Sequence, residues 1–270
     1  DVNLPSFADR EANAARPRYN TNYLRPYKGY SQILMGLSDA GSSYQAAQVF
    51  LSKRRGDLTF TLNYTLGRSY DNGSGNFDNP ADGPEDIDYY WGPSDFYRTH
   101  IFVGTWAYRL PFFKDNRGLL GQVLGGWEVS GITRYQTGGH LTVSGPTSIG
   151  GRRADYLGGD PYNDERINPT TGAVQWLNRA AFASAPEGRR GNSERGQFTG
   201  PAYHIWDISL RKQFGISDDV RLQVQADFFN AFNMVNWGNP NTDLSSANFG
   251  LITAVTGQPR NIQLGVRLIF

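Results

Sequence analysis

Hydrophobic and polar positions alternate along this chain with a period of two, most clearly in residues 58–70 and 261–270. In the second stretch the apolar side chains fall on one side of an extended strand, while Asn261, Gln263 and Arg267 fall on the other. A helix would mix these polar residues into the apolar stripe. Both stretches therefore predict strands with one apolar and one polar face.

Six further stretches show a similar alternation or a short apolar run, so about eight strands are predicted. They are residues 30–37, 44–54, 98–110, 122–136, 203–214 and 220–228. Residues 1–29 show no sustained period and predict a loop, and a short helix is expected near 174–182. The pattern predicts an all-β chain of antiparallel strands.

The connections between these strands alternate between long and short. The long ones are 71–97, 137–201 and 233–259, whereas 54–57 and 215–219 are brief and 111–121 is intermediate. Long extracellular loops and short periplasmic turns are typical of outer-membrane β-barrels, and about ten residues suffice for a tilted strand to cross a bilayer. Residues 1–270 are thus predicted to form one transmembrane β-barrel segment in a bacterial outer membrane, with lipid against its apolar face.

Composition and charge bear on which partners and which compartment are expected for this chain. The chain has 32 Gly, 15 Tyr, 16 Phe and no Cys among 270 residues. Its formal charge of +1 provides no field that would attract nucleic acid, so no nucleic-acid partner is expected.

Residues 1–5 show neither the basic nor the apolar region of a signal peptide. An exported protein would have lost that peptide, or the chain would be a piece of a longer one.

Charged residues recur on the polar side of the predicted strands, where they would face the lumen of a barrel. These lumen-facing candidates are Glu128, Arg134, Asp207, Arg211, Arg221, Asp227 and Arg267. Charges in this position can pair with one another, contact a plug or contact a substrate. Aromatic residues suit girdles at the membrane boundaries. They are Tyr64, Trp91, Trp106, Tyr108, Trp127, Tyr135 and Trp206.

No catalytic or cofactor-binding pattern is visible, and the chain is predicted not to be an enzyme. His100, His140 and His204 lack the short spacing of a metal site. The acidic stretch 155–165, with Asp155, Asp160, Asp164 and Glu165, could offer oxygen ligands to calcium. Its spacing differs from that of an EF-hand, which favours a solvated acidic loop over a metal site.

Several phrases resemble the carboxyl-terminal portion of TonB-dependent outer-membrane receptors. They are residues 43–49, 58–65, 207–212, 228–233 and 259–264, followed by the terminal Phe270. The nearest resemblance is to the Oar-like branch, which carries a carboxypeptidase-regulatory-like domain at its other end. Such receptors form barrels of roughly 22 strands around a plug.

The resemblance implies that these strands are the last third of a larger barrel. Phe270 would then be a signal read by the barrel-assembly machinery, and the TonB complex would be a partner if the parent chain has a plug. The outer loops would bind an unknown ligand. This sequence shows neither a plug nor a TonB-contacting box.

Three functions are therefore considered. The preferred one is the barrel part of a TonB-dependent receptor that takes up or binds a ligand through its outer loops. A second is a complete small barrel with a structural or adhesive role, which requires the strand near Tyr30 to pair with the strand that ends at Phe270. A third is a soluble β-sheet binding module.

Overall fold

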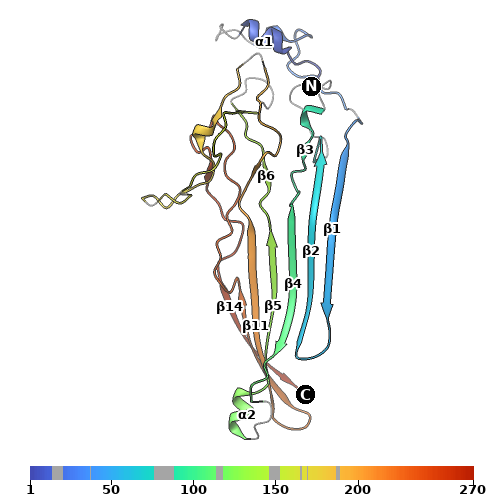
Figure 1. Cartoon of the computed structure of the whole chain (residues 1–270), viewed down its shortest axis with the longest axis vertical. Helices are drawn as coiled ribbons and strands as arrows, with labels where there is room; N and C mark the ends of the chain where they lie inside the picture. Colours follow the sequence, from blue (N-terminus) through green and yellow to red (C-terminus); the bar gives the residue numbers. More distant parts are fainter. Residues whose placement is uncertain are drawn as a thin grey trace.

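Seven long strands form one antiparallel sheet in the computed structural model, in the order β1-β2-β4-β5-β11-β12-β14 (Figure 1). Their bounds are β1 Ser42–Lys53, β2 Leu58–Asp71, β4 His100–Arg109, β5 Trp127–Gln136, β11 Tyr203–Gly215, β12 Arg221–Phe229 and β14 Asn261–Ile269. The two-residue strand β3, Gly92–Pro93, pairs with β2. The structure describes residues 1–13, 21–36, 38–75, 88–113, 118–145, 153–164, 166–168, 170–186 and 189–270. The prediction of an all-β antiparallel chain is confirmed.

The register separates the two faces as the alternation predicts. Leu62 lies opposite Leu51 on β1 and Gly104 on β4, while Thr61 lies opposite Ser52 and Thr105. Because directly opposed residues of an antiparallel pair point to the same side, the apolar rows of all the long strands form one continuous face. Among the described residues no protein layer covers that face along the long strands: Leu264, for example, is 78% exposed. We call the two sides the apolar face and the polar face.

Two of the predicted strands differ from the structure: the strand at 30–37 is not formed in the described residues, and the strand at 122–136 begins later than predicted. Residues 30–36 form no strand, and Leu37 lies outside the described residues. The buried Asn3 side chain instead donates to the carbonyl oxygens of Tyr27 and Tyr30, and its amide oxygen accepts from the Tyr27 backbone. These bonds hold the segment in a loop. The apolar run therefore stays outside the sheet.

Residues 122–124, predicted as the start of a strand, form the short helix α2, Leu119–Leu124, together with the end of the predicted connection. Gly125 and Gly126 end it, and Gly126 has a φ of 72°, which glycine adopts readily. The strand β5 begins only at Trp127. The predicted loop of residues 1–29 also contains regular structure, namely α1, Phe7–Asn13, and the 3₁₀ turn η1, Thr21–Leu24.

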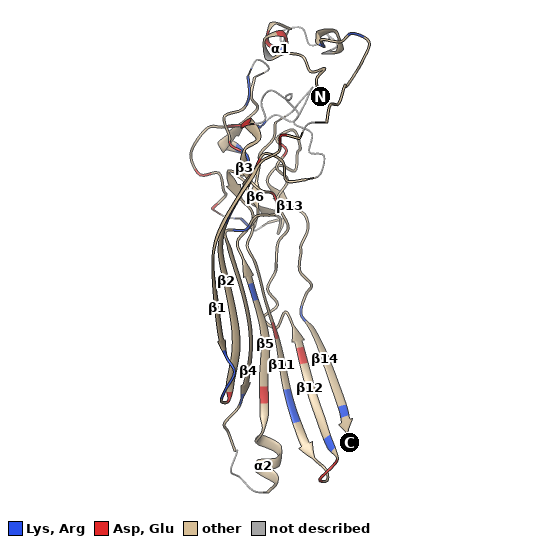
Figure 2. Ribbon diagram, turned by 90° about the vertical axis from the view of Figure 1, so that its right-hand side faces the viewer, with Lys and Arg blue, Asp and Glu red and all other residues tan. Residues whose placement is uncertain are grey.

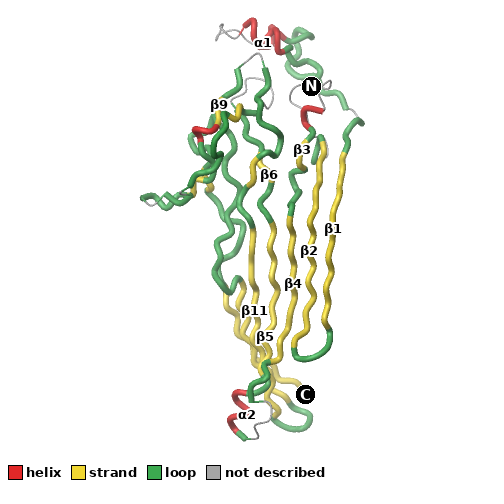
Figure 3. Tube along the Cα trace, in the orientation of Figure 1, coloured by secondary structure: helices red, strands yellow, loops and turns green. Residues whose placement is uncertain are grey.

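Long and short connections lie at opposite ends of the sheet, as Figure 3 shows. We call the end that carries the connections β2–β4, β5–β11 and β12–β14 the loop end, and the other the turn end. At the turn end, Gly56 with a φ of 89° allows the tight β1–β2 turn, and the Ile216 backbone amide donates to the Val220 carbonyl at 2.8 Å. Ile269, the last residue of β14, also lies at the turn end, opposite Arg221.

The hydrophobic core lies in the connections of the loop end rather than in the sheet. Its buried members are Leu141, Val143, Ala154, Val174, Trp176, Leu177, Ala181, Phe182, Phe198, Leu244, Phe249 and Ile252. Short strand pairs frame it: β6 His140–Leu141 with β10 Phe198–Thr199, β7 Asp155–Tyr156 with β9 Phe182–Ala183, and β8 Val174–Gln175 with β13 Leu251–Ile252. We call this folded unit, formed by the described parts of residues 137–202 and 230–260, the loop cap.

The short helix expected near 174–182 is largely wrong, because this segment is divided between β8, the 3₁₀ turn η3, Arg179–Ala181, and β9. Only η3 is helical, and the Asn178 side chain caps it by accepting from the Ala180 amide at 3.1 Å. The segment packs its apolar residues into the loop cap. Tertiary packing therefore decided its conformation.

The sheet is open, because its pairing runs from β1 to β14 without returning. Each of these strands pairs with one neighbour only, and no described residue of β1 pairs with β14. The pairing of a first strand near Tyr30 with the last strand, which a small closed barrel requires, is therefore not formed within the described residues.

Candidate functional site: the polar face and the loop cap

All seven lumen-facing candidates lie on the polar face. The register places Arg211 between Glu128 on β5 and Gln225 on β12, and Asp227 opposite Ser209 and Gln263. Arg134, Asp207, Arg221 and Arg267 are an even number of residues from these positions on the same strands and therefore share their side. In Figure 2 the charges appear as isolated bands along otherwise uncharged strands. That this face lines a lumen stays a prediction.

Glu128 forms the one ion-paired centre among these candidates in the described part of the polar face. Its carboxylate accepts from Arg211 Nη2 at 2.5 Å and lies 3.7 Å from Arg109 Nε on the other side. The three residues come from adjacent strands β4, β5 and β11 and stand in direct register. Arg109 was missed in the sequence, although its alternation with Ala107 and Thr105 on β4 could have placed it on this face.

Asp207 and Asp227, the two aspartates among these candidates, accept hydrogen bonds from neutral groups rather than from a cation. Asp227 accepts from the Gln225 amide at 2.9 Å, and Gln225 belongs to a chain of amides that continues through Gln223 to Gln213. The Asp207 carboxylate accepts from the Asn230 backbone amide at 2.8 Å, at the point where β12 ends and the cap connection begins. Both aspartates border a shallow hollow together with Ser209.

Arg134, Arg221 and Arg267 are not brought together with an acid. Within the described residues none of the three forms an ion pair. They differ in this respect from Arg211. Because an arginine inside a barrel stays hydrated or finds a partner, these three are the cations of the polar face that remain available to a plug or a ligand.

The predicted girdle aromatics on the long strands all lie on the apolar face. The register aligns Tyr64 with Phe102 and Tyr135 towards the loop end, and Tyr108 with Val129 towards the turn end. Trp91 lies outside the long strands, just before β3 and beside the start of β1. Aromatic residues towards both ends of an exposed apolar face match the two boundaries of a bilayer.

The loop cap is one unit because side chains of its first connection bind the backbone of its second. The Gln175 amide donates to the Phe249 carbonyl at 2.9 Å, and Arg179 donates to Leu244 at 2.6 Å and to Ser246 at 3.1 Å. Leu177, at the centre of the core, is fully buried. A surface built this way presents its exposed residues in a fixed arrangement.

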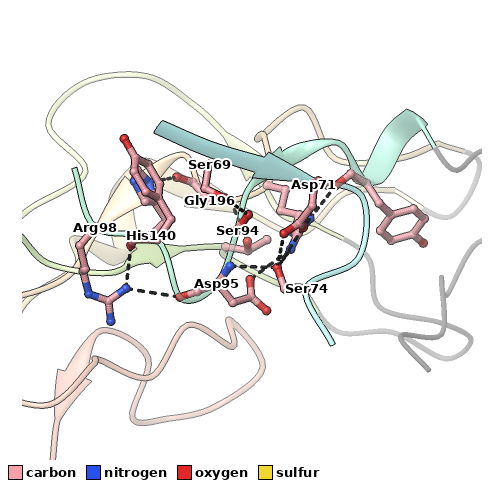
Figure 4. A network of polar contacts seen from close by, with 12 residues as sticks. Ser69, Asp71, Ser74, Ser94, Asp95, Arg98, His140 and Gly196 are labelled. Atoms are coloured by element: carbon pink, nitrogen blue, oxygen red, sulfur yellow. Dashed lines mark hydrogen bonds and ion pairs between the residues drawn. The ribbon is translucent and has the colours of Figure 1, made fainter. Parts of the chain in front are cut away.

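A polar network fastens the loop cap to the rim of the sheet (Figure 4). Arg195, from the cap, donates to Asp71 Oδ1 at 2.8 Å and to Ser74 Oγ at 2.7 Å. Its Nη2 atom lies 3.3 Å from Asp95 Oδ1. His140 stacks on Tyr97 with ring centroids 4.9 Å apart and donates from Nδ1 to a cap carbonyl at 2.9 Å.

Sequence reasoning missed this network. Arg195 lies in an aperiodic stretch, and its partners are about 100 residues or more away in the chain. Only the register of the sheet and the fold of the cap bring them together. No local signal in the sequence could have shown the contact.

The acidic stretch 155–165 is not uniformly solvated, in contrast to the favoured interpretation. Asp155 is buried and accepts two hydrogen bonds from Arg189, at 2.7 and 2.6 Å. These bonds hold the pKa of Asp155 below its ordinary 3.8 although burial opposes them. Among the described residues no group of three or more His, Asp or Glu side chains could hold a metal ion, and Glu165 lies outside them.

We expect the Asp155–Arg189 pair to make the stability of the loop cap depend on pH. A carboxylate with a lowered pKa in the folded state contributes stability that is complete above about pH 4 and is lost as the pH falls through the folded pKa. Hydrogen exchange of cap amides, followed between pH 7 and pH 3, measures this pH dependence of loop-cap stability. Asp155→Asn should flatten this dependence.

Asp160→Asn provides the matched control, since Asp160 is exposed and, among the described residues, its carboxylate accepts only from the nearby Tyr162 backbone amide. The control should keep the pH dependence of the unsubstituted protein. If Asp155→Asn and Asp160→Asn give the same profile, the Asp155–Arg189 pair does not carry the effect.

The histidines serve separate local contacts. His100 Nδ1 lies 2.7 Å from the Tyr64 hydroxyl on the apolar face, His140 lies in the rim network, and the His204 backbone amide donates to Asn236 at 2.8 Å. They come from β4, the loop cap and β11 and do not converge. No catalytic arrangement of the three exists in the described structure.

An antiparallel sheet with an uncovered apolar face, a polar opposite face and its long connections at one end has the construction of a membrane-spanning β-barrel wall. The chain matches the family described as "Outer membrane beta barrel domain" over residues 2–263, and it belongs to that family. No curated protein and no solved structure matches it. The described helices include none that is long and apolar enough to span a bilayer.

Membership in this family places the protein in the bacterial outer membrane, as the alternation of faces and loop lengths predicted. A soluble β-sheet binding module does not fit that location. The family description gives neither a ligand nor a coupling partner.

Proposed function

We propose that this chain forms the carboxyl-terminal wall of a TonB-dependent receptor of the Oar-like type, which takes up or binds a ligand through its loop cap. The observation that carries the proposal is the open sheet. Both β1 and β14 leave one edge without a partner in the described structure, and unpaired backbone groups cannot face lipid. In this proposal further strands cover both edges. The phrases shared with TonB-dependent receptors point to a large barrel as their source.

The loop cap supports a receptor role. It folds around its own core and is fastened to the sheet by Arg195. Preorganised surfaces bind ligands at a lower entropic cost than mobile loops do. The three unpaired arginines of the polar face would contact a plug or a passing anionic ligand. No enzymatic step is proposed.

A complete small barrel with a structural or adhesive role remains the rival proposal. It would require β1 and β14 to approach and pair, against the open arrangement described above. It would also leave no place for a plug, because a barrel of about eight strands is filled by its own side chains.

The intact mass of the protein isolated from its native outer membrane separates the two proposals. A mass well above 30.1 kDa is expected for a receptor. In the same membranes, photo-crosslinkers in the periplasmic part of the parent chain should capture TonB. A heat-modifiable species of 30.1 kDa that yields no TonB adduct would refute the receptor proposal.

A further inference from the structure

The helix α2, at the turn end, exposes every large apolar side chain it has. Leu119 is 80% exposed and Leu120 66%, and Val123 and Leu124 are also exposed. Phe112 and Phe113, which precede the helix, are exposed as well. Residues 118–126 contain no charge and only one polar side chain, Gln122. Such a surface is costly in water at roughly 25 cal/mol per Å² of apolar area.

Two contacts fasten α2 to the apolar face of the sheet. Trp127 Nε1 donates to the Val123 carbonyl at 3.0 Å, and Lys212 Nζ donates to the Gly125 carbonyl. Trp127 and Lys212 stand in direct register on β5 and β11 and share the side of Val129 and Leu210. The helix therefore lies on the side of the wall that faces lipid.

The position of α2 along the wall corresponds to a membrane boundary. It directly precedes Trp127, the first residue of β5, and Figure 1 shows it at the turn end. The Lys212 ammonium lies 5.7 Å from the Trp127 ring and 4.9 Å from the Phe214 ring. Aromatic rings with a lysine among them are typical of the headgroup level.

We propose that α2, together with Phe112 and Phe113, inserts into the lipid leaflet at the turn end and anchors the wall there. The occupant of this surface is the boundary between headgroups and acyl chains, because the exposed apolar residues of α2 lie on the same side as the lipid-facing row of the sheet, at its turn end. An in-plane segment of this kind buries its apolar side about 5–10 Å into that boundary. The inference depends on the membrane location alone, not on the proposed receptor function.

Single-cysteine labelling tests the proposal, since the chain has no cysteine of its own. Leu119→Cys, labelled with an environment-sensitive fluorophore, is compared with Asp219→Cys in the β11–β12 turn at the same end. The full protein is placed in phospholipid vesicles that contain spin-labelled acyl chains. We expect lipid quenching several-fold stronger at position 119 than at 219, and the reverse order with aqueous iodide.

Two outcomes would overturn the inference. Equal iodide quenching at both positions would place α2 in water. Protection of position 119 from both quenchers would place it against protein. Since Leu120 is exposed too, Leu120→Cys gives a second reading should Leu119→Cys fail to reach the heat-modifiable folded form.

Discussion

Replacing Leu62 by arginine is expected to destabilise the folded protein in a bilayer by about 2–4 kcal/mol, the range for a cation near the midplane of a lipid-facing strand. Leu62 is the middle residue of the apolar row of β2, between Leu58 and Leu66. Its neighbours across the sheet are Leu51 and Gly104, which offer no partner to a guanidinium. The charge would have to remain in hydrocarbon or bend towards a boundary.

Thr61→Arg is the matched control, because Thr61 is one position away on the polar face, between Ser52 and Thr105. Denaturant-induced unfolding from phospholipid vesicles measures both variants, and the control should lose less than about 1 kcal/mol. Equal losses at the two positions would mean that the apolar face does not contact lipid.

The strands were predictable because each one lies between two environments along its whole length. The alternation alone predicted a strand at 58–70, and β2 is observed at Leu58–Asp71. It likewise predicted a strand at 261–270, and β14 is observed at Asn261–Ile269. No information about neighbouring strands was needed, since the period of side chains in a strand is fixed by the backbone. The same alternation placed the charged candidates together on one face.

The segments that were mispredicted are those in which local contacts override periodicity. In residues 122–124 the end of a short helix accommodates apolar residues that suggested a strand, and two glycines then end that helix. In residues 30–36 the hydrogen bonds from Asn3 hold the chain away from the sheet. Neither effect is visible in the alternation of apolar and polar residues.

The loop cap was beyond prediction for a different reason. Its core joins residues as distant as Leu141 and Ile252, each from a stretch too short to show a period. Aperiodic sequence rich in Gly, Asn and Asp resembles an unstructured loop when it is taken one stretch at a time. What makes it fold is the mutual burial of several such stretches, which only their arrangement above the sheet allows.

Replacing Arg195 by alanine is expected to have the largest effect, releasing the loop cap from the rim at a cost of about 3–5 kcal/mol, the range for removing one partner of a buried ion pair. The side chains of Arg195 and Asp71 are 12% and 4% exposed. Arg195 also donates to the backbone carbonyl oxygens of Asp71 and Tyr90, at 2.8 and 3.0 Å. Without it the Asp71 carboxylate keeps hydroxyl donors but no cation.

Release of the loop cap is measured by hydrogen exchange of the 137–201 connection and by its cleavage with protease. The heat-modifiable electrophoretic mobility of the protein, which reports on the folded sheet, should stay unchanged. Glu194→Ala is the control, because the side chain of this exposed neighbour forms no hydrogen bond or ion pair among the described residues and its removal should leave protection as it was. Adding Asp71→Asn to Arg195→Ala should restore part of the protection, since the buried charge is then gone as well. If the double variant is no better protected than Arg195→Ala alone, the ion pair is not what holds the cap, and the backbone contacts of Arg195 must account for the loss.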